Sequence, residues 1–346
     1  MTHFDIVPVD PSNHALVESW LATHQAVEAH DFQGLRPQHP LRRLTSLVVA
    51  GRDQRDEFWA AVCDGVVLGS LRLSLSDRDN THLAMFSLSV HPDHRGRGVA
   101  TALLRHAEER AAEDGRTTIS SWLDEPSEAS PLVRGDGGPF LVHKGYQRSL
   151  QGLVRRCDLD AVDEEALERL WREARERSAD FEVIAYENTA PDDLVDGVAY
   201  MQARMYTDMP LGDWDLQEAV IDRGHVRETE RLQRLKGDLR LHVVVRHKES
   251  GEIAGHTEIL VEGGEEEHCT QGDTIVDPRF RGHRLGLVLK IANQRRVREW
   301  RPRMRYVWTG NAESNSHMIA INEAVGYRLA GRDAVYQKKL SQKKLG

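Results

Sequence analysis

The chain has 346 residues, about twice the length of an average domain, so we expect two domains. Hydrophobic residues make up 40% and charged residues 29% of the sequence, which is ordinary globular usage and excludes a disordered or fibrous chain. The formal net charge of −9 argues against a protein that binds nucleic acid by neutralising phosphates.

The start of the chain predicts no secretory signal, because Met1–Pro8 contain neither a basic stretch nor an apolar one. No run of about 18 apolar residues occurs in the sequence, so we expect no transmembrane helix and no membrane partner. The three cysteines, Cys63, Cys157 and Cys269, are scattered without a CxxC pair, and the histidines show no HExxH spacing. We therefore expect reduced thiols, no metal site and a cytoplasmic protein.

The sequence repeats itself once. Three segments recur in the same order about 180 residues later: Phe4–Val7 as Phe181–Ile184, Leu88–Gly98 as Thr274–Arg284, and Lys144–Tyr146 as Val325–Tyr327. The shared order and near-constant separation indicate a duplicated domain. We place an N-terminal domain at residues 1–158, a linker helix at 159–179 and a C-terminal domain at 180–346. The linker, Asp160–Ser178, carries apolar residues at helical spacing, which predicts a helix packed between the domains.

Strand and helix patterns follow the same order in both copies, and the turn Asp64-Gly65 predicts a hairpin in the first. The elements predicted in the first copy are a strand at Asp5–Val9, a helix within Ala15–Val27, strands at Phe58–Cys63, Val66–Ser74 and Met85–Val90, a helix at Thr101–Glu113 and a strand at Thr117–Leu123. Those of the second copy are strands at Glu182–Tyr186, Leu241–Arg246, Ile253–Val261 and Asp273–Val276, a helix at Leu287–Glu299 and a strand at Tyr306–Thr309.

A glycine- and arginine-rich turn lies between a strand and a helix in both copies. It reads Arg95-Gly96-Arg97-Gly98-Val99-Ala100 in the first and Arg281-Gly282-His283-Arg284-Leu285-Gly286 in the second. Backbone N–H groups at a helix N-terminus bind anions, glycines let a diphosphate approach, and arginines add charge-assisted contacts. An exposed basic loop is the alternative, but the recurrence of the turn between a strand and a helix favours a phosphate-binding site.

Two motifs carry a resemblance to a known family. The pattern Arg95-x-x-Gly98-x-Ala100 resembles the acyl-CoA pyrophosphate-binding motif of the GNAT superfamily of N-acetyltransferases, and the second copy is similar, with Arg284 where the family usually has a glycine. The segment Asn311–Tyr327 resembles the second family signature, which runs from a strand into a helix and ends in Gly-Phe or Gly-Tyr. Since the two copies cover roughly residues 4–150 and 180–340, the chain resembles tandem GNAT proteins.

The resemblance implies an α+β fold, in which a mixed, mainly antiparallel sheet is flanked by helices on both faces, repeated as two tandem GNAT domains. It also implies acetyl-CoA as a cosubstrate, bound by strand N–H groups that polarise the thioester carbonyl and by the two turns. The implied acetyl-CoA-binding residues are Leu88, Ser89, Val90, Arg95, Gly96, Arg97, Gly98, Val99, Ala100, Thr274, Ile275, Val276, Arg281, Gly282, His283, Arg284, Leu285, Gly286, Asn311 and Asn315.

The sequence departs from the family at its catalytic positions. The family's general acid is commonly a tyrosine four residues before the glycine of the second signature, where this chain has Leu141 and Asn322. Leu141 transfers no proton, and Asn322 can only donate a hydrogen bond, for which we expect the departing sulfur or the pantetheine as acceptor. No carboxylate is evident early in the fourth strand of either copy. We therefore expect at most one competent site, in the C-terminal domain, and an N-terminal domain that binds acetyl-CoA without catalysis.

Glu258 and Asn322 are the expected catalytic residues. Glu258 shares a strand face with His256 by alternation and is the predicted base; a solvent-facing strand glutamate is the alternative. Asp208 is predicted to hold a cationic substrate, with an ordinary turn or helix-cap aspartate as the alternative.

Three functions fit these residues. The first is transfer of an acetyl group from acetyl-CoA to the primary amine of a small molecule by direct attack. The second is acetylation of a protein or peptide, and the third is a non-catalytic acyl-CoA-binding module. We favour the first, with a small-molecule amine as partner, no nucleic acid, and a monomer or homodimer.

Overall fold

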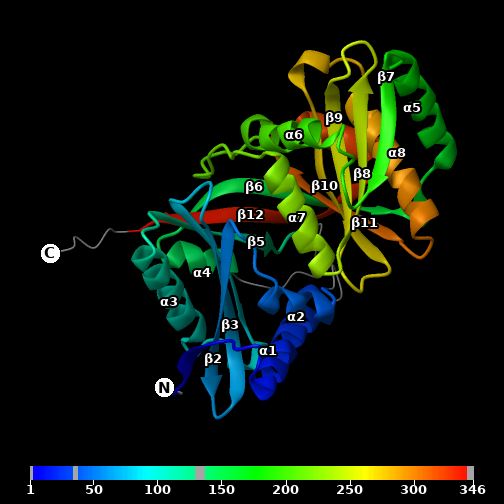
Figure 1. Cartoon of the computed structure of the whole chain (residues 1–346). Coiled ribbons are helices and arrows are strands. Elements are labelled where there is room, and N and C mark those ends of the chain that lie inside the picture. The colour runs from blue at the N-terminus through cyan, green and yellow to red at the C-terminus, as the bar shows by residue number, and fades with distance from the viewer. Residues whose placement is uncertain (1–2, 34–37, 129–136, 341–346) are drawn as a thin grey trace. The chain divides into compact units, whose positions relative to one another are not determined.

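The computed structural model describes residues 3–33, 38–128 and 137–340 (Figure 1). The chain divides into two compact units. Unit 1 comprises Met1–Gln151, Leu211–Gln217 and Gly331–Gly346, and unit 2 comprises Gly152–Pro210 and Glu218–Ala330. Each unit combines helices with a mixed, mostly antiparallel sheet, which confirms the predicted α+β class.

Unit 1 contains a sheet with the strand order β1-β2-β3-β4-β5-β12. Its described elements are β1 (Asp5–Pro8), α1 (His14–Val27), a π-helical turn (Glu28–Phe32), α2 (Pro40–Val48), β2 (Gln54–Cys63), β3 (Val66–Ser76), β4 (Leu83–Val90), a short 3-10 turn (Pro92–His94), α3 (Val99–Glu113), β5 (Thr118–Glu125), α4 (Gly137–His143), the first part of β6 (Gln147–Asp158) and most of β12 (Arg328–Lys339). The predicted hairpin is present, because Asp64 and Gly65 take φ values of 49° and 78° and connect β2 to β3.

Helices cover both faces of the unit 1 sheet, because successive residues of a strand point to opposite sides. Ala60 of β2 belongs to a core cluster with Trp20 of α1. The next residue, Ala61, belongs to a second cluster with Leu103 of α3.

Unit 2 contains a sheet with the strand order β6-β11-β10-β9-β8-β7. Its described elements are the second part of β6, a 3-10 turn (Leu159–Ala161), α5 (Glu164–Arg177), β7 (Phe181–Glu187), α6 (Val195–Asp208), α7 (Arg223–Leu235), β8 (Leu239–His247), β9 (Ile253–Val261), β10 (His268–Val276), a 3-10 turn (Pro278–Phe280), α8 (Leu285–Trp300), β11 (Tyr306–Ala312), α9 (Ser316–Ala324) and the start of β12.

The unit 2 sheet is also covered on both faces. Val244 of β8 packs in one cluster with Val198 of α6 and Val226 of α7. Val243 packs in the opposite cluster with Val288 of α8. The predicted linker helix is α5, and its buried residue Leu167 joins the α8 cluster, so this helix packs on α8 within unit 2.

Two parallel strands separate after a short pairing in each unit. β4 pairs with β5 over Leu83–Met85, and β10 pairs with β11 over His268–Thr270. Beyond these residues, β4 continues to pair with β3 and β10 with β9, so each has one edge without a partner among the described strands. β10 carries a bulge between Gln271 and Thr274, which inserts an extra residue opposite β9. β4 pairs with β3 without such a shift.

The sequence patterns did not predict the long strands β6 and β12. Gly152–Asp158 of β6 pair with β11 in unit 2, and Arg332–Lys339 of β12 pair with β5 in unit 1. Each compact unit therefore includes a strand from outside the range predicted for its domain. The predicted domain limits, residue 158 for the first domain and residue 180 for the second, describe the repeats in the sequence and stay a prediction.

The expectations about membrane-spanning helices and about the cysteines can be compared with the described residues 3–33, 38–128 and 137–340. Every helix in them is too short or too polar to cross a membrane. Cys63, Cys157 and Cys269 carry free thiols.

Candidate active site

Both arginine-rich turns take the same backbone path into a helix. Gly96 and Gly282 have φ values of 71° and 90°, which suit glycine. The residue before the helix is also left-handed in both turns, with φ of 87° at Gly98 and 57° at Arg284. Unit 1 therefore uses glycine at this position, whereas unit 2 holds an arginine in a strained conformation. The turns place free helix N-terminal N–H groups next to positive side chains, as an anion site requires.

The first arginine of each turn is engaged by the protein itself. Arg95 donates to the Val90 carbonyl at 3.1 Å and to both Asp31 carboxylate oxygens at 2.9 and 2.6 Å. Arg281 donates to the Val276 carbonyl at 3.4 Å and to Asp208 at 2.9 Å.

The predicted substrate ligand Asp208 is therefore part of an ion-pair network. Its carboxylate accepts from Arg204 at 2.6 Å as well as from Arg281. With two guanidinium partners in place, Asp208 orders the turn that follows Val276, and its role in holding a cationic acceptor stays a prediction.

The other predicted acetyl-CoA residues lie on the strand ends and on the first helical turns. Leu88, Ser89 and Val90 end β4, and Thr274, Ile275 and Val276 end β10, where both strands have a free edge among the described strands. Val99 and Ala100 begin α3, Leu285 and Gly286 begin α8, and Arg97 and His283 lie in the turns two residues before these helices. A Cβ atom on Gly286 would approach the Ile321 side chain of α9 at 3.2 Å, so substitution there also presses on a neighbouring helix.

The three asparagines of the second signature have separate structural roles. Asn315 caps α9, because its side chain accepts a hydrogen bond from the Met318 N–H at 3.1 Å. Asn322 is fully buried, and its Nδ2 donates to Oδ1 of Asn311 at 3.3 Å. This bond connects α9 to β11. It fixes the position of Asn322, the residue that the sequence predicts to donate a hydrogen bond to the sulfur or the pantetheine.

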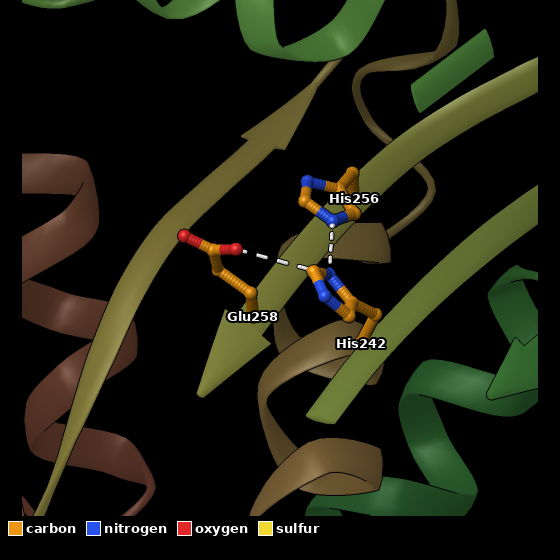
Figure 2. Close-up of side chains that lie close together, drawn as sticks. All are labelled: His242, His256 and Glu258. Atoms are coloured by element: carbon orange, nitrogen blue, oxygen red, sulfur yellow. Dashed lines mark hydrogen bonds and ion pairs between the residues drawn. The ribbon is translucent and has the colours of Figure 1, made fainter. Parts of the chain in front are cut away.

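Glu258 lies in a buried polar cluster on β8 and β9. Figure 2 shows its carboxylate directed at His242, whose ring also meets His256. His242 Nδ1 lies 3.8 Å from Glu258 Oε2 and 3.1 Å from His256 Nε2. The cluster is on the α6 and α7 face, because Tyr186 of that core stacks on His242 at 4.6 Å. The predicted common face of His256 and Glu258 is thus present, but it is covered by helices instead of facing solvent.

Arg240 controls the protonation of this cluster. Burial alone would raise the pKa of Glu258, but the Arg240 guanidinium, 2.5 Å from Oε1, and the two histidines lower this pKa to about 2. Burial lowers the pKa of His242 to about 3 and that of His256 to about 4, against the opposing charge of Glu258. Near neutral pH the cluster therefore contains an ionised carboxylate and two neutral imidazoles. A carboxylate held so strongly in its ionised form is a weak proton acceptor.

Sequence reasoning missed Asp273, which lies in the bulge of β10. Burial and the charge of Glu258 raise the pKa of Asp273 to about 6, although Arg240 opposes this shift. The bulge is closely packed at Gly272, the residue before Asp273, where a Cβ atom would come within 2.8 Å of Glu258 Oε1. A glycine inside a strand pattern is a known signal of a bulge, and Gly272 was the clue available in the sequence.

The bulge is connected to the rest of the site by side-chain hydrogen bonds. Gln271 Nε2 donates to the Glu258 carbonyl at 2.6 Å and to Thr257 Oγ1 at 2.9 Å. Thr309 of β11 donates to the Gln271 carbonyl at 3.3 Å. β9, β10 and β11 are therefore fixed to one another where β10 and β11 separate.

Unit 1 lacks the corresponding acidic groups. Its strands β3 and β4 contain no Asp or Glu, whereas the equivalent strands of unit 2, β9 and β10, contain Glu258 and Asp273. Leu141, at the family's acid position, is a buried core residue of α4. Unit 1 thus combines a turn with glycine at the left-handed position before the helix and strands β3 and β4 that carry no carboxylate.

Comparison with known proteins agrees with this geometry. Residues 17–130 match the model of the acetyltransferase (GNAT) family. Over its whole length the chain is similar to a tandem GNAT protein from the clavulanic acid biosynthesis pathway, solved without acetyl-CoA, at 26% identity and a TM-score of 0.81, with 99% of this chain and 100% of that chain covered. The chain has the tandem GNAT fold. At the level of the family, these matches support an acyl-CoA-dependent acetyltransferase.

Two other solved structures are similar over nearly the whole chain, but their sequence identities are low and they show the fold alone. A GCN5-related N-acetyltransferase from Sphaerobacter thermophilus has 17% identity and a TM-score of 0.63, with 97% of this chain and 96% of that chain covered. The glucosamine N-acetyltransferase region of a fungal multi-domain β-N-acetylglucosaminidase has 14% identity and a TM-score of 0.67, covering 98% of this chain and 38% of that one. No curated protein sequence matches the chain.

Proposed function

We propose that this tandem GNAT protein transfers an acetyl group from acetyl-CoA to the primary amine of a small molecule, with the catalytic site in unit 2. The proposal is carried by the bulge of β10, which contains Asp273 and whose Gly272 packs against the Glu258 carboxylate where β10 and β11 separate. Unit 1 has the same free strand edge without an acidic group on β3 or β4. Unit 1 is proposed to bind acetyl-CoA without catalysis.

In the proposed reaction, the turn at Arg281–Gly286 holds the diphosphate of acetyl-CoA with helix N-terminal N–H groups. The free edge of β10 beyond Thr270 offers backbone N–H groups that stabilise negative charge on the thioester oxygen during attack. Asp273 takes a proton from the acceptor ammonium, because only the neutral amine has a lone pair for the carbonyl carbon. A C–N bond then forms, the C–S bond breaks, and the thiolate leaves without an acid because a thiol has a pKa of about 8.5. The nitrogen loses its second proton to solvent as the amide forms, which completes the reaction.

Glu258 and Asn322 act on this site indirectly. The Glu258 charge raises the pKa of Asp273 toward neutrality, which makes Asp273 a stronger base than an ordinary aspartate. Asn322 is fixed by Asn311 and is proposed to donate to the sulfur or the pantetheine. In this assignment Asp273 replaces Glu258 as the base, and Glu258 becomes a positioning residue.

The acceptor class rests on how the acidic groups are covered. Glu258 and its histidine neighbours are buried on the sheet face that packs against α6 and α7, instead of lying on an open sheet face. This arrangement suits a compact amine better than an extended peptide. Peptide acetylation and a non-catalytic acyl-CoA-binding module remain the alternatives, and the cytoplasmic location and the monomer or homodimer remain predictions.

The test measures thiol release from acetyl-CoA with a panel of amino sugars, polyamines and amino acids, compared with a panel of peptides. Calorimetry with acetyl-CoA alone counts the occupied units. We expect release with at least one small amine, two bound acetyl-CoA molecules, and a single one in Arg97→Glu. Release with peptides alone would support the second function, and binding without release with any acceptor would support the third.

A further inference from the structure

The proposed acetyl transfer uses only the charge of Glu258 and gives no role to the two histidines, His242 and His256, that lie against it. One potential ligand atom from each residue lies within 4.8 Å of the others, and all three side chains are buried. Figure 2 shows His242 between the other two, with its ring nitrogen facing both. Two ligands of a tetrahedral zinc ion lie about 3.4 Å apart, given Zn–N bonds of about 2.0–2.1 Å. The observed separations of 3.1 Å to His256 and 3.8 Å to Glu258 bracket that value.

Two buried polar atoms of the cluster lack hydrogen-bond partners in the part of the chain that the structure describes. They are Glu258 Oε2 and His256 Nδ1. Glu258 is only 8% exposed and His256 is 0% exposed, so neither atom is compensated by bulk solvent. An unpaired buried carboxylate oxygen costs free energy, and a metal ion at this position would satisfy it.

We propose that His242 Nδ1, His256 Nε2 and Glu258 Oε2 bind one divalent transition-metal ion of the zinc class. Two imidazoles and a carboxylate are a ligand set that zinc accepts, whereas calcium and magnesium prefer oxygen ligands alone. Binding requires a change of tautomer in one ring, since the two facing nitrogens now share a hydrogen. His256 Nδ1, which is unpartnered, is then the atom that carries the hydrogen of its ring.

Arg240 is compatible with this ion because it uses the other carboxylate oxygen. Its Nη1 donates to Glu258 Oε1, while the proposed ligand atom is Oε2. A donor that orients a ligating carboxylate is a usual feature of metal sites. His242 of β8 and Glu258 of β9 are directly opposite each other in the sheet, so the backbone pairing holds these two ligands side by side.

The test uses the full chain after treatment with a chelator. Zinc is titrated by calorimetry, and cobalt is titrated by its visible absorption, which is intense for a tetrahedral site with nitrogen ligands. We expect one ion per chain, and affinity at least about 100-fold weaker in His242→Gln and in Glu258→Gln. His317→Gln, which removes an exposed histidine of the same unit, is the matched control and should bind as the wild type does. Added zinc should raise the Tm of the wild type but not that of the two cluster variants.

Zinc binding of equal strength in the wild type and both cluster variants, or no binding in the wild type, would overturn the proposal. Circular dichroism shows whether each variant is folded. If His242→Gln does not fold, the test is made with Glu258→Gln, which keeps the size of the side chain. Acetyl-CoA binding is measured on the same metal-free protein. Failure of the metal site and failure of the acetyl-CoA site are therefore separate results.

Discussion

Arg281 and Asp208 form an ion pair at 2.9 Å that connects the arginine-rich turn of unit 2 to the last residue of α6. Unit 1 repeats the arrangement, since Arg95 pairs with Asp31 at 2.6 Å in the π-helical turn after α1. In both units the arginine also donates to a carbonyl at the end of the preceding strand. The duplicated domain has thus kept a contact between its first helical region and its turn.

The first prediction follows from this ion pair. Asp208→Asn should raise the KM for acetyl-CoA by about threefold, because the Arg281 side chain must then be ordered on binding at a cost of about 0.5–1.5 kcal/mol. The KM for the acceptor should change by less than about twofold, in steady-state kinetics with each substrate varied in turn. A large rise in acceptor KM with an unchanged acetyl-CoA KM would instead make Asp208 a ligand of the cationic acceptor.

The second prediction concerns the base. Asp273→Asn should lower kcat/KM by about 10²-fold or more near neutral pH, since the acceptor ammonium loses its proton acceptor. In the wild type, kcat/KM should fall on the acid side with an apparent pKa near the value of about 6 to which burial and Glu258 raise Asp273. The measurement is a pH–rate profile of thiol release by the metal-free protein, because a metal ion bound by Glu258 would offset the charge that acts on Asp273.

Glu258→Gln is the matched variant for this profile. Removal of the Glu258 charge removes one of the two causes that raise the pKa of Asp273, so the acid limb should move to lower pH while activity at high pH is largely retained. If Glu258 were the base, the same variant would lose its activity at every pH at which the amine is protonated. The two assignments therefore give opposite results.

The third prediction is a pH dependence of stability. Burial lowers the pKa of His242 from 6.5 to about 3 in the folded protein, so the unfolded chain takes up a proton that the folded chain does not. The free energy of unfolding therefore keeps its full value above pH 6.5. It decreases as pH falls toward 3, by about 1.4 kcal/mol per pH unit for one histidine, because protonation then favours the unfolded chain. His242→Gln should therefore show a smaller fall in the free energy of unfolding between pH 6.5 and 4.5. Asp273 acts in the opposite direction in both proteins and cancels in the comparison.

Urea unfolding at a series of pH values checks this third prediction. Curves of free energy against pH that run parallel in the wild type and in His242→Gln would show that His242 titrates normally in the folded chain. The variant must be compared at constant metal content, because a metal ion bound by the cluster would add its own pH dependence.

The fourth prediction concerns the start of α3. Gly98 has a φ of 87°, and a Cβ atom built on it meets no heavy atom within 4 Å. Gly98→Ala should therefore destabilise unit 1 by about 1–2 kcal/mol through backbone strain alone. Gly98→Asn should cost less, because asparagine tolerates the left-handed region. Hydrogen exchange of the first turn of α3 measures the effect locally, and equal exchange in Gly98→Ala and the wild type would contradict it.

Much of the fold could be predicted from the sequence because its repeats carry local signals. The strand Ile253–Val261 was predicted to the residue, and the hairpin at Asp64-Gly65 follows from turn chemistry that two residues suffice to encode. The helix predicted at Thr101–Glu113 is α3, which begins two residues earlier at Val99. Local patterns of this kind need no knowledge of the partner strand.

The missed features depend on partners far away in the sequence. β6 contains Arg155, which is 4% exposed and pairs with Glu323 at 3.0 Å, so a buried arginine interrupts the apolar pattern of that strand. The bulge at Asp273 depends on the register of β10 against β9. The weak basicity of Glu258 depends on Arg240, a residue on the neighbouring strand whose contact no sequence pattern specifies.

The placement of β12 affects the order in which the protein can mature during synthesis. Arg332–Lys339 supply the strand next to β5 in unit 1, and they are translated more than 200 residues after Glu125. The ribosome therefore releases the first repeat with one edge of β5 still exposed, and an exposed strand edge invites pairing with other chains. A nascent chain stalled before residue 331 should consequently be more prone to aggregation and proteolysis than the finished protein, although it already contains every residue of the first arginine-rich turn.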